Sequence, residues 1–435
     1  MRSSRNAKEV TDFTFHRHRP SHLLSGGTSP SAKTIVFTPF TSSYTSSTTT
    51  PNFWALQGIK VNPYGRKGDY LITGTTGSAL SAGGVGTVYV GSINRQSTSS
   101  GSGSGQWINF NVPFAGADGT SVYGPDILSR GNGPGGIGKV ALVGTWTKSG
   151  SDNIFGFYYE GKLNKLKIDP TSSEGFESFQ ATTKLIDPVT KDNLHARDTY
   201  LHSVDGGYAV GNYSTLPGFI NFAINSGFDS GSYVYNPRKN SQINASYGND
   251  GYKYHSLFGI WQNVNKTYTV SGGASDAGLQ NKFIEYLGKN SNLVPGLPQD
   301  AVFGKGMLAD IDPLTGIVNN EQVYNYNNDP GSDTLTHFEG IYYAGNGVYE
   351  APFTAVTSSG GQVGIAYMKR LDNGTFSHDA LWQTFPTNPE GVLASNDSVA
   401  GAASVGAFLP GGSMFSTYAA LSQTQSYLEA AQFLH

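Results

Sequence analysis

Cysteine does not occur anywhere in this chain of 435 residues. Disulfide bonds, thiolate metal sites and a cysteine nucleophile are therefore excluded. Charged residues are also scarce, at 14% of the chain with a formal net charge of −3, so the electrostatics give no indication of a nucleic-acid partner. The sequence has no run of about twenty apolar residues, which excludes a membrane-spanning helix.

The first 32 residues have little apolar content and are rich in Arg, His and Ser. No hydrophobic segment follows Met1, so no signal peptide is visible. We expect residues 1–32 to form a disordered tail. A basic contact arm built on Arg17, His18 and Arg19 is the alternative interpretation.

Turn-forming and aromatic residues are plentiful. The chain has 57 Gly, about 13% against a usual share of about 7%, together with 25 Tyr and 24 Phe. Gly and Ser supply turns, while Tyr and Phe favour half-buried strands. This composition predicts an all-β protein.

Residues 120–161 contain the clearest local pattern. Three short β-rich runs, at 120–124, 140–146 and 155–161, are separated by a glycine-rich loop and a polar turn. The pattern is typical of one blade of a β-propeller. It recurs in weaker form along the chain, and its second strand is marked in turn by Gly74, Gly144, Gly211, Gly272, Glu350 and Gly406.

The marks are 56 to 78 residues apart, which suits a four-stranded blade with its loops. We therefore predict a single β-propeller of six blades of four antiparallel strands, with five or seven blades left open. An N-terminal strand at 33–37 would close the ring and remove an exposed edge. The predicted domain spans 33–435, with blades at about 51–117, 118–194, 195–248, 249–333, 334–392 and 393–435.

The best two repeats resemble the HAF-type repeats of bacterial extracellular proteins. Val143-Gly144-Thr145-Trp146 is followed by Gly156-Phe157-Tyr158-Tyr159, and Val210-Gly211-Asn212-Tyr213 is the next match. The resemblance implies a propeller-like protein that is extracellular or surface-associated. Such repeats carry no agreed catalytic residues, so the resemblance assigns none here.

Three histidines fall on the opening strands of consecutive predicted blades, where a propeller lines its channel. His202, His255 and His337 could converge on a divalent metal, with Glu339 or Asp205 as a further ligand. Their offsets to the following glycine are 4, 4 and 3, and a shift of one residue turns a side chain to the other face. Channel histidines bonded to the backbone are therefore the alternative.

Acidic and aromatic residues near strand ends supply the other candidate sites. Glycoside hydrolysis needs two carboxylates, and the candidates for a catalytic role are Asp205, Glu339 and Glu350. The candidates for ligand binding, as flat surfaces for a sugar, are Trp54, Tyr123, Trp261 and Tyr342. Packing between blades is the alternative role for these rings.

Two functions remain in view. The leading prediction is a non-enzymatic binding or surface-interaction protein that recognises a glycan, a small ligand or a protein through its loop face or channel mouth. The alternative is a propeller enzyme: a glycan-acting hydrolase or lyase, or a metal-dependent enzyme with a channel histidine site. An enzyme requires converging acids or histidines, whereas a binding module requires only a broad polar or aromatic face.

Overall fold

A computed structural model describes most of the chain. The chain divides into two compact units, residues 1–34 and 35–435, and every described residue lies in the second. The predicted tail at 1–32 lies outside the described residues. These are 37–39, 54–66, 69–76, 83–92, 105–186, 189–215, 230–248, 252, 254–275, 304–329, 335–357, 360–384, 402–409 and 413–421.

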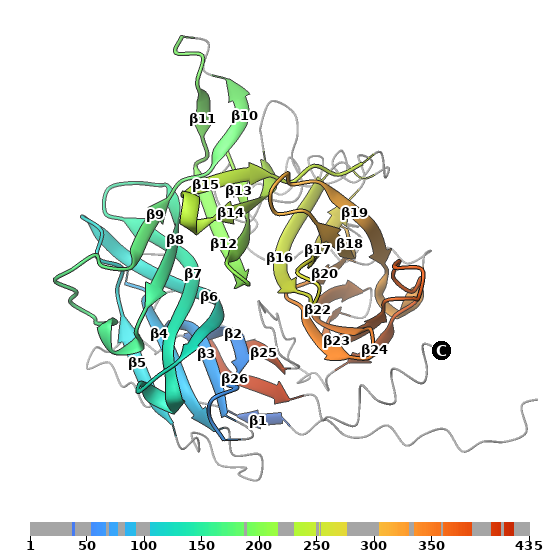
Figure 1. Ribbon diagram of the computed structural model, residues 1–435, viewed down its shortest axis with the longest axis horizontal. Helices are drawn as coiled ribbons and strands as arrows, with labels where there is room; N and C mark the ends of the chain where they lie inside the picture. The colour runs from blue at the N-terminus through green and yellow to red at the C-terminus, as the bar shows by residue number, and fades with distance from the viewer. Residues whose placement is uncertain are drawn as a thin grey trace, which may run out of the picture. The chain divides into compact units, whose positions relative to one another are not determined.

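The described residues form β-strands and short 3₁₀ turns, without an α-helix, which confirms the all-β prediction (Figure 1). Among them, no helix is long and apolar enough to cross a membrane. Two of the sheets are simple antiparallel meanders of four strands. They are β2 (Trp54–Val61), β3 (Asp69–Thr76), β4 (Val85–Ser92) and β5 (Gln106–Phe110), and β16 (Tyr254–Gln262), β17 (Tyr268–Ser275), β18 (Lys305–Ile311) and β19 (Val318–Tyr324).

Two more meanders of four strands are joined into one eight-stranded sheet. Their connection is a single parallel pairing, Asp198 with Ile154, so each keeps the strand order of a blade. The first comprises β6 (Ala117–Arg130), β7 (Ile137–Lys148), β8 (Ile154–Gly161) and β9 (Phe176–Phe179). The second comprises β12 (Asp198–Asp205), β13 (Tyr208–Ser214), β14 (Ser230–Asn236) and β15 (Ser241–Asn244). The two-stranded ribbon between them, β10 (Thr182–Ile186) and β11 (Asn193–His195), was not predicted.

The fifth sheet has an interrupted first strand. It contains β20 (Leu335–Phe338), β21 (Tyr342–Gly345), β22 (Val348–Thr357), β23 (Gly360–Lys369) and β24 (Leu381–Thr384). Both β20 and β21 pair with β22, so together they take the place of one opening strand. The last sheet contains β25 (Ala402–Leu409), β26 (Ser413–Leu421) and β1 (Phe37–Pro39).

Strand β1 pairs antiparallel with β26, so the start of the second unit adds a strand to the last sheet. The sequence places this strand at 33–37, and the structure places it at 37–39. Strands β14 and β18 take the third position in their sheets.

The glycine marks of the repeat have a common structural cause. Gly144, Gly211 and Gly272 each pair with a residue of the opening strand that directly precedes a β-bulge. A Cβ atom on Gly211 would lie 1.9 Å from the carbonyl oxygen of Tyr200, and one on Gly144 would lie 2.0 Å from that of Ser121. The opening strand therefore approaches the second strand too closely for any side chain at this register.

Two of the predicted marks were wrong. In the fifth sheet the residue before the interruption, Phe338, pairs with Phe353, so Phe353 rather than Glu350 occupies the equivalent position. In the last sheet Gly406 lies on β25 and pairs with Thr417 of β26. We call the first strand of each sheet or four-stranded meander its inner strand. The inner strands include β2, β6, β12 and β16.

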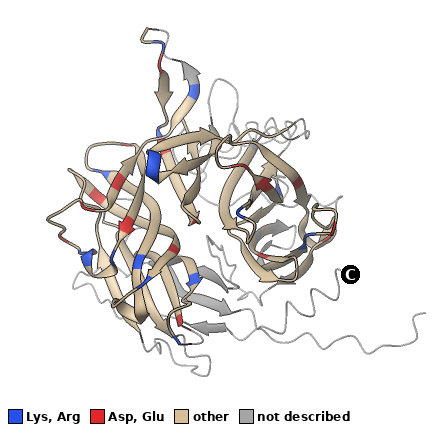
Figure 2. Ribbon diagram, in the orientation of Figure 1, with Lys and Arg blue, Asp and Glu red and all other residues tan. Residues whose placement is uncertain are grey.

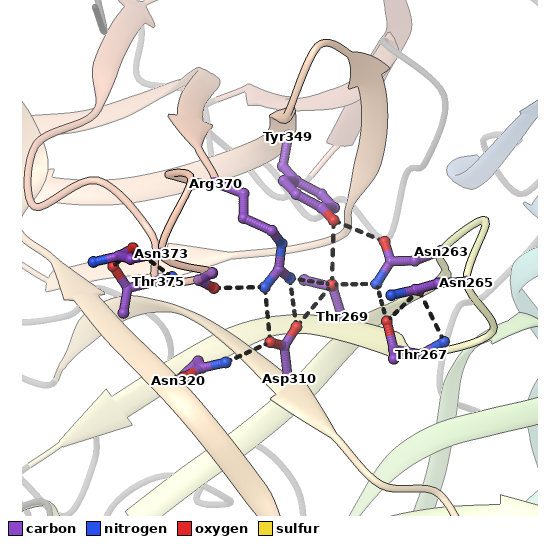
Figure 3. Close-up of polar contacts among 11 residues, drawn as sticks. Asn263, Asn265, Thr267, Thr269, Asp310, Asn320, Tyr349, Arg370, Asn373 and Thr375 are labelled. Atoms are coloured by element: carbon purple, nitrogen blue, oxygen red, sulfur yellow. Dashed lines mark hydrogen bonds and ion pairs between the residues drawn. The ribbon is translucent and has the colours of Figure 1, made fainter.

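An arginine-centred network joins the sheet of β16 to β19, the fourth along the chain, to the fifth sheet, which contains β20 to β24 (Figure 3). Arg370, which follows β23, donates Nη1 to Asp310 Oδ2 at 2.8 Å and Nη2 to Asp310 Oδ1 at 2.5 Å. Its Nη2 also donates to Thr269 Oγ1 at 2.9 Å, and its guanidinium lies 4.3 Å from the centre of the Phe376 ring. A two-pronged ion pair that is only about one-fifth exposed fixes geometry as well as energy.

We predict that Arg370→Ala lowers the free energy of unfolding by about 2 to 3 kcal/mol, because it leaves Asp310 without its cation in a largely buried position. Urea-induced unfolding at neutral pH measures the change. Arg66→Ala, at an exposed position, is the control and should change stability by less than about 0.5 kcal/mol. Equal stability of the Arg370→Ala variant and the wild type would contradict the network's role.

Candidate functional site

The inner strands share one irregularity, and it determines which side chains leave the regular pleat. Register shifts occur at Gln57 in β2, after Val122 in β6, at His202 in β12 and at Phe258 in β16. In the fifth sheet Glu339 lies in the interruption between β20 and β21. A bulge places an extra residue outside the regular pairing and redirects its side chain.

The redirected residues Tyr123, His202, Phe258 and Glu339 come together in space with His337, and we call these five residues the inner-strand cluster. The ring of His202 is 5.1 Å from that of Tyr123 and 3.9 Å from that of Phe258, between ring centres. The Phe258 ring is 4.4 Å from the ring of His337. His337 Nδ1 is 3.1 Å from Glu339 Oε1. Residues more than 200 positions apart in the sequence thus form one continuous group.

The cluster combines a carboxylate, two imidazoles and aromatic faces in a largely buried setting. His202, His337 and Glu339 are each exposed by less than 10%. Burial lowers the pKa of His202 to about 3, against the raising effect of the Glu339 charge, while His337 adds to the lowering. His202 therefore stays neutral at physiological pH and can act as a hydrogen-bonding group but not as a cation.

A second polar group lies at the ends of three inner strands. Lys60 Nζ contacts Asp126 Oδ1 at 2.7 Å and Asp205 Oδ1 at 2.6 Å, so one ammonium joins β2, β6 and β12. The backbone N–H of Gln262 donates to Asp205 Oδ2 at 2.6 Å, which adds β16. The ammonium also lies 5.7 Å from the centre of the Trp261 ring. We call Lys60, Asp126 and Asp205 the lysine clamp.

The protonation of the clamp reflects its burial. Burial alone would lower the pKa of Lys60, but the charges of Asp205 and Asp126 raise it, so the ammonium stays charged. Burial raises the pKa of Asp205, Lys60 opposes that shift, and the nearby Asp126 carboxylate adds to it. Because Lys60 occupies the space between the two carboxylates, the clamp fits a structural role better than a substrate site.

The structure does not bring the three predicted metal ligands together. Phe258 lies between His202 and His337 and contacts both rings. His255 lies elsewhere, stacked at 3.6 Å on Tyr247 and 3.4 Å from Glu321 of β19. Within the described part of the chain, no three His, Asp or Glu side chains are arranged to hold a metal ion. The proposed convergence fails because the bulges displace His202 and Phe258 but leave His255 in the regular pleat on another face.

The other predicted site residues divide between packing and the cluster. Tyr123 is 3% exposed and belongs to the cluster. Trp261 and Tyr342 are half-buried and pack edge to face at 5.3 Å across two sheets, which is the packing alternative. Glu350 is 1% exposed on β22 and pairs in register with Tyr342 of β21. The side chain of Trp54 lies outside the described residues, although its backbone belongs to β2.

A shallow cavity of about 420 Å³ adjoins the lysine clamp. Asp126, Lys139, Tyr158, Glu160 and Arg238 are among its lining residues. The Tyr158 hydroxyl donates to Glu160 Oε2 at 3.1 Å, and the acidic and basic groups offset one another. Figure 2 likewise shows charged residues of both signs scattered over the described strands. The cavity therefore has no strong preference for an anion or a cation.

Sequence reasoning missed Phe258 and Lys60, although a signal for the first was present. Each inner strand carries an apolar residue, then a variable residue, then Gly or Ser, as in Leu257-Phe258-Gly259 and Leu201-His202-Ser203. The variable residue is the one that the bulge redirects. Lys60 had no such signal, because its partners come from other sheets.

We predict that Lys60→Met destabilises the fold by about 3 to 5 kcal/mol at neutral pH, because Asp126 and Asp205 then face each other without a cation. Urea-induced unfolding measures the loss. The triple variant Lys60→Met/Asp126→Asn/Asp205→Asn removes the like charges and should recover most of it. A triple variant no more stable than Lys60→Met would contradict this account.

We predict a stability penalty in acid that arises from His202. Its folded-state pKa of about 3 lies below the unfolded value near 6.5, so the unfolded chain binds the extra proton and stability falls as pH drops through that interval. The contribution is about 1.4 kcal/mol for each pH unit between those limits. His202→Phe should reduce the pH slope of the unfolding free energy by this amount. Tyr200→Phe, beside the same ring, should not, and an unchanged slope in His202→Phe would disprove the assignment.

The chain was also compared with known families, curated proteins and solved structures. A scan against protein-family models finds no match, and a search of curated proteins finds none either. Solved structures that are similar to the chain include three glycan-acting enzymes. An endo-arabinase from Bacteroides thetaiotaomicron VPI-5482 is 10% identical, with a TM-score of 0.32, covering 66% of this chain and 90% of that one.

The other two come from Fusarium graminearum. A GH93 α-L-arabinofuranosidase in complex with arabinobiose is 10% identical over 86% of this chain and 94% of that one, with a TM-score of 0.41. An α-L-arabinofuranosidase mutant with an iminosugar inhibitor is 11% identical over 85% and 93%, with a TM-score of 0.40. Similarities at these levels place no individual residue in an active site.

One prediction is corrected by these findings. The leading interpretation, a non-enzymatic binding or surface-interaction protein, was wrong. The endo-arabinase and the two α-L-arabinofuranosidases named above agree better with the alternative, a glycan-acting hydrolase. The resemblance to HAF-type repeats remains a prediction, since no family model bears on it.

Proposed function

We propose that this chain is a glycan-acting hydrolase that uses the inner-strand cluster as its active site. The observation that carries the proposal is the position of Glu339, a largely buried carboxylate. The bulges of three inner strands and the interruption in the fifth sheet set it among aromatic rings and neutral imidazole. Flat rings suit the faces of a sugar, and a positioned carboxylic acid can transfer a proton to or from the glycosidic oxygen.

Glu339 is assigned the proton transfer. Its Oε1 is held by His337, and its charge acts on the pKa of His202, so it lies within the electrostatic reach of both imidazoles. Hydrolysis of a glycosidic bond also needs a second carboxylate. Asp198 is our candidate, because it begins the inner strand β12 and its charge contributes to the raised pKa of Tyr200, whose ring stacks with that of His202 at 5.8 Å.

The finer architecture belongs to the same proposal. Six sheet units follow one another along the chain, and β1 pairs with the last, as expected for a six-bladed propeller closed by an N-terminal strand. An extracellular or surface location remains part of the proposal, because such a location suits an enzyme that acts on a polymeric glycan. Since the solved structures found are arabinofuranosidases and an endo-arabinase, arabino-oligosaccharides should head the substrate panel.

We predict that the purified chain releases reducing sugar from at least one member of a panel of arabino-, xylo-, galacto- and gluco-oligosaccharides. Glu339→Gln should lower kcat about 10²- to 10⁴-fold, because it removes the transferable proton while keeping shape and hydrogen bonding. Asp198→Asn should lower kcat by a similar factor.

The matched control is Glu321→Gln. Glu321 also pairs with a histidine, His255, in a buried setting, but it lies on β19 away from the cluster. This variant should keep kcat within about threefold of wild type. Absence of hydrolysis on the whole panel, or a Glu339→Gln variant as active as Glu321→Gln, would contradict the proposed function.

A further inference from the structure

A hydrogen-bonded chain leads from the backbone of β17 to Glu339. The N–H of Gly273 donates to Ser256 Oγ at 3.1 Å, and Ser256 Oγ lies 3.0 Å from His337 Nε2. The other ring nitrogen of His337, Nδ1, lies 3.1 Å from Glu339 Oε1. Ser256, His337 and Glu339 are each at most 8% exposed, so water competes little for these bonds.

The hydrogen bonds from Gly273 to Glu339 all run in one direction. A hydroxyl oxygen that already accepts the Gly273 N–H can donate its own hydrogen to His337 Nε2. His337 Nδ1 then carries the ring hydrogen and donates it to the Glu339 carboxylate, the tautomer that pairs every group along the chain. Oε1 of Glu339 is thereby occupied, whereas Oε2 has no hydrogen-bond partner among the described residues.

Gly273 has a second role in the same chain. A Cβ atom at this position would lie 2.6 Å from His337 Cδ2, so any side chain would displace the imidazole. The absence of a side chain at Gly273 and its N–H therefore fix both ends of the Ser256 to His337 contact. The site is built so that the ring lies in one place, with one nitrogen toward each partner.

From this arrangement we propose that His337 is a positioning residue that binds Glu339 Oε1 and leaves Oε2 as the oxygen that exchanges a proton with the glycan, with Ser256 fixing the tautomer of His337. The inference rests on the proposed hydrolase function for its catalytic consequence. Its structural content, the Nδ1–H tautomer, does not depend on activity. The same geometry also places a serine hydroxyl beside a histidine, as in enzymes with a serine nucleophile. The test below separates a nucleophilic role of Ser256 from the positioning role.

The first measurement is nuclear magnetic resonance of the full chain labelled with ¹⁵N-histidine, at pH 8. His337→Gln identifies the signals of His337. We expect a bare Nε2 and a hydrogen on Nδ1, with Ser256→Ala changing the Nε2 shift. Ser271→Ala is the matched control. Ser271 lies on β17, the strand paired with the β16 strand of Ser256, and its Oγ donates to the carbonyl of Gly340 rather than to His337. A hydrogen on Nε2 alone, or an equal response to Ser271→Ala, would overturn the inference.

The second measurement is steady-state kinetics on the best substrate of the panel. Ser256→Ala should lower kcat about tenfold or more with KM within about twofold, because it loosens the orientation of the reacting group rather than the binding of the sugar. Unchanged kcat in Ser256→Ala would overturn the positioning role. Labelling of Ser256 by a fluorophosphonate would also overturn it, since the hydroxyl would then be a nucleophile itself. If no glycan is hydrolysed while the tautomer is as expected, the hydrolase proposal fails and the hydrogen-bonded chain stands.

Discussion

The close approach of each inner strand to its neighbour is the constraint on which the site depends. Where the strands meet most closely, only glycine fits on the second strand, as Gly211 against Tyr200 and Gly272 against Ser256 show. The inner strand then gains an extra residue, and that residue turns away from the sheet. A packing requirement of the backbone thus determines where Tyr123, His202 and Phe258 point.

Contacts between sheets give that arrangement its rigidity. The lysine clamp joins three inner strands at one level, and the Arg370–Asp310 pair joins the fourth and fifth sheets at another. Both are largely buried ion pairs, which matter more for fixing position than for net stability. A cluster assembled from separate sheets needs such fixed contacts, because an error of about 1 Å in the position of a catalytic group is costly.

Much of the fold could be predicted from the sequence, because strand length, turn residues and the glycine mark are local properties. The repeats at Gly144, Gly211 and Gly272 were placed correctly, whereas Glu350 was given the wrong register and Gly406 the wrong strand. The site was predicted in part. His202, His337, Glu339 and Tyr123 were named, but their grouping depends on bulges that shift the face of a side chain by one residue. The role of His255 as a metal ligand failed for this reason, and the partners of Lys60 lie too far along the chain for any pattern to connect them.

The central claim is that the inner-strand cluster binds and cleaves a glycan. It is tested most directly by a crystal structure of the Glu339→Gln variant soaked with arabinobiose and, in parallel, with xylo- and gluco-oligosaccharides. The account predicts a sugar bound against the rings of Tyr123, His202 and Phe258, with its glycosidic oxygen within hydrogen-bonding distance of the substituted side chain. Sugar bound only at another surface, or no sugar bound from any of these sources, would contradict it.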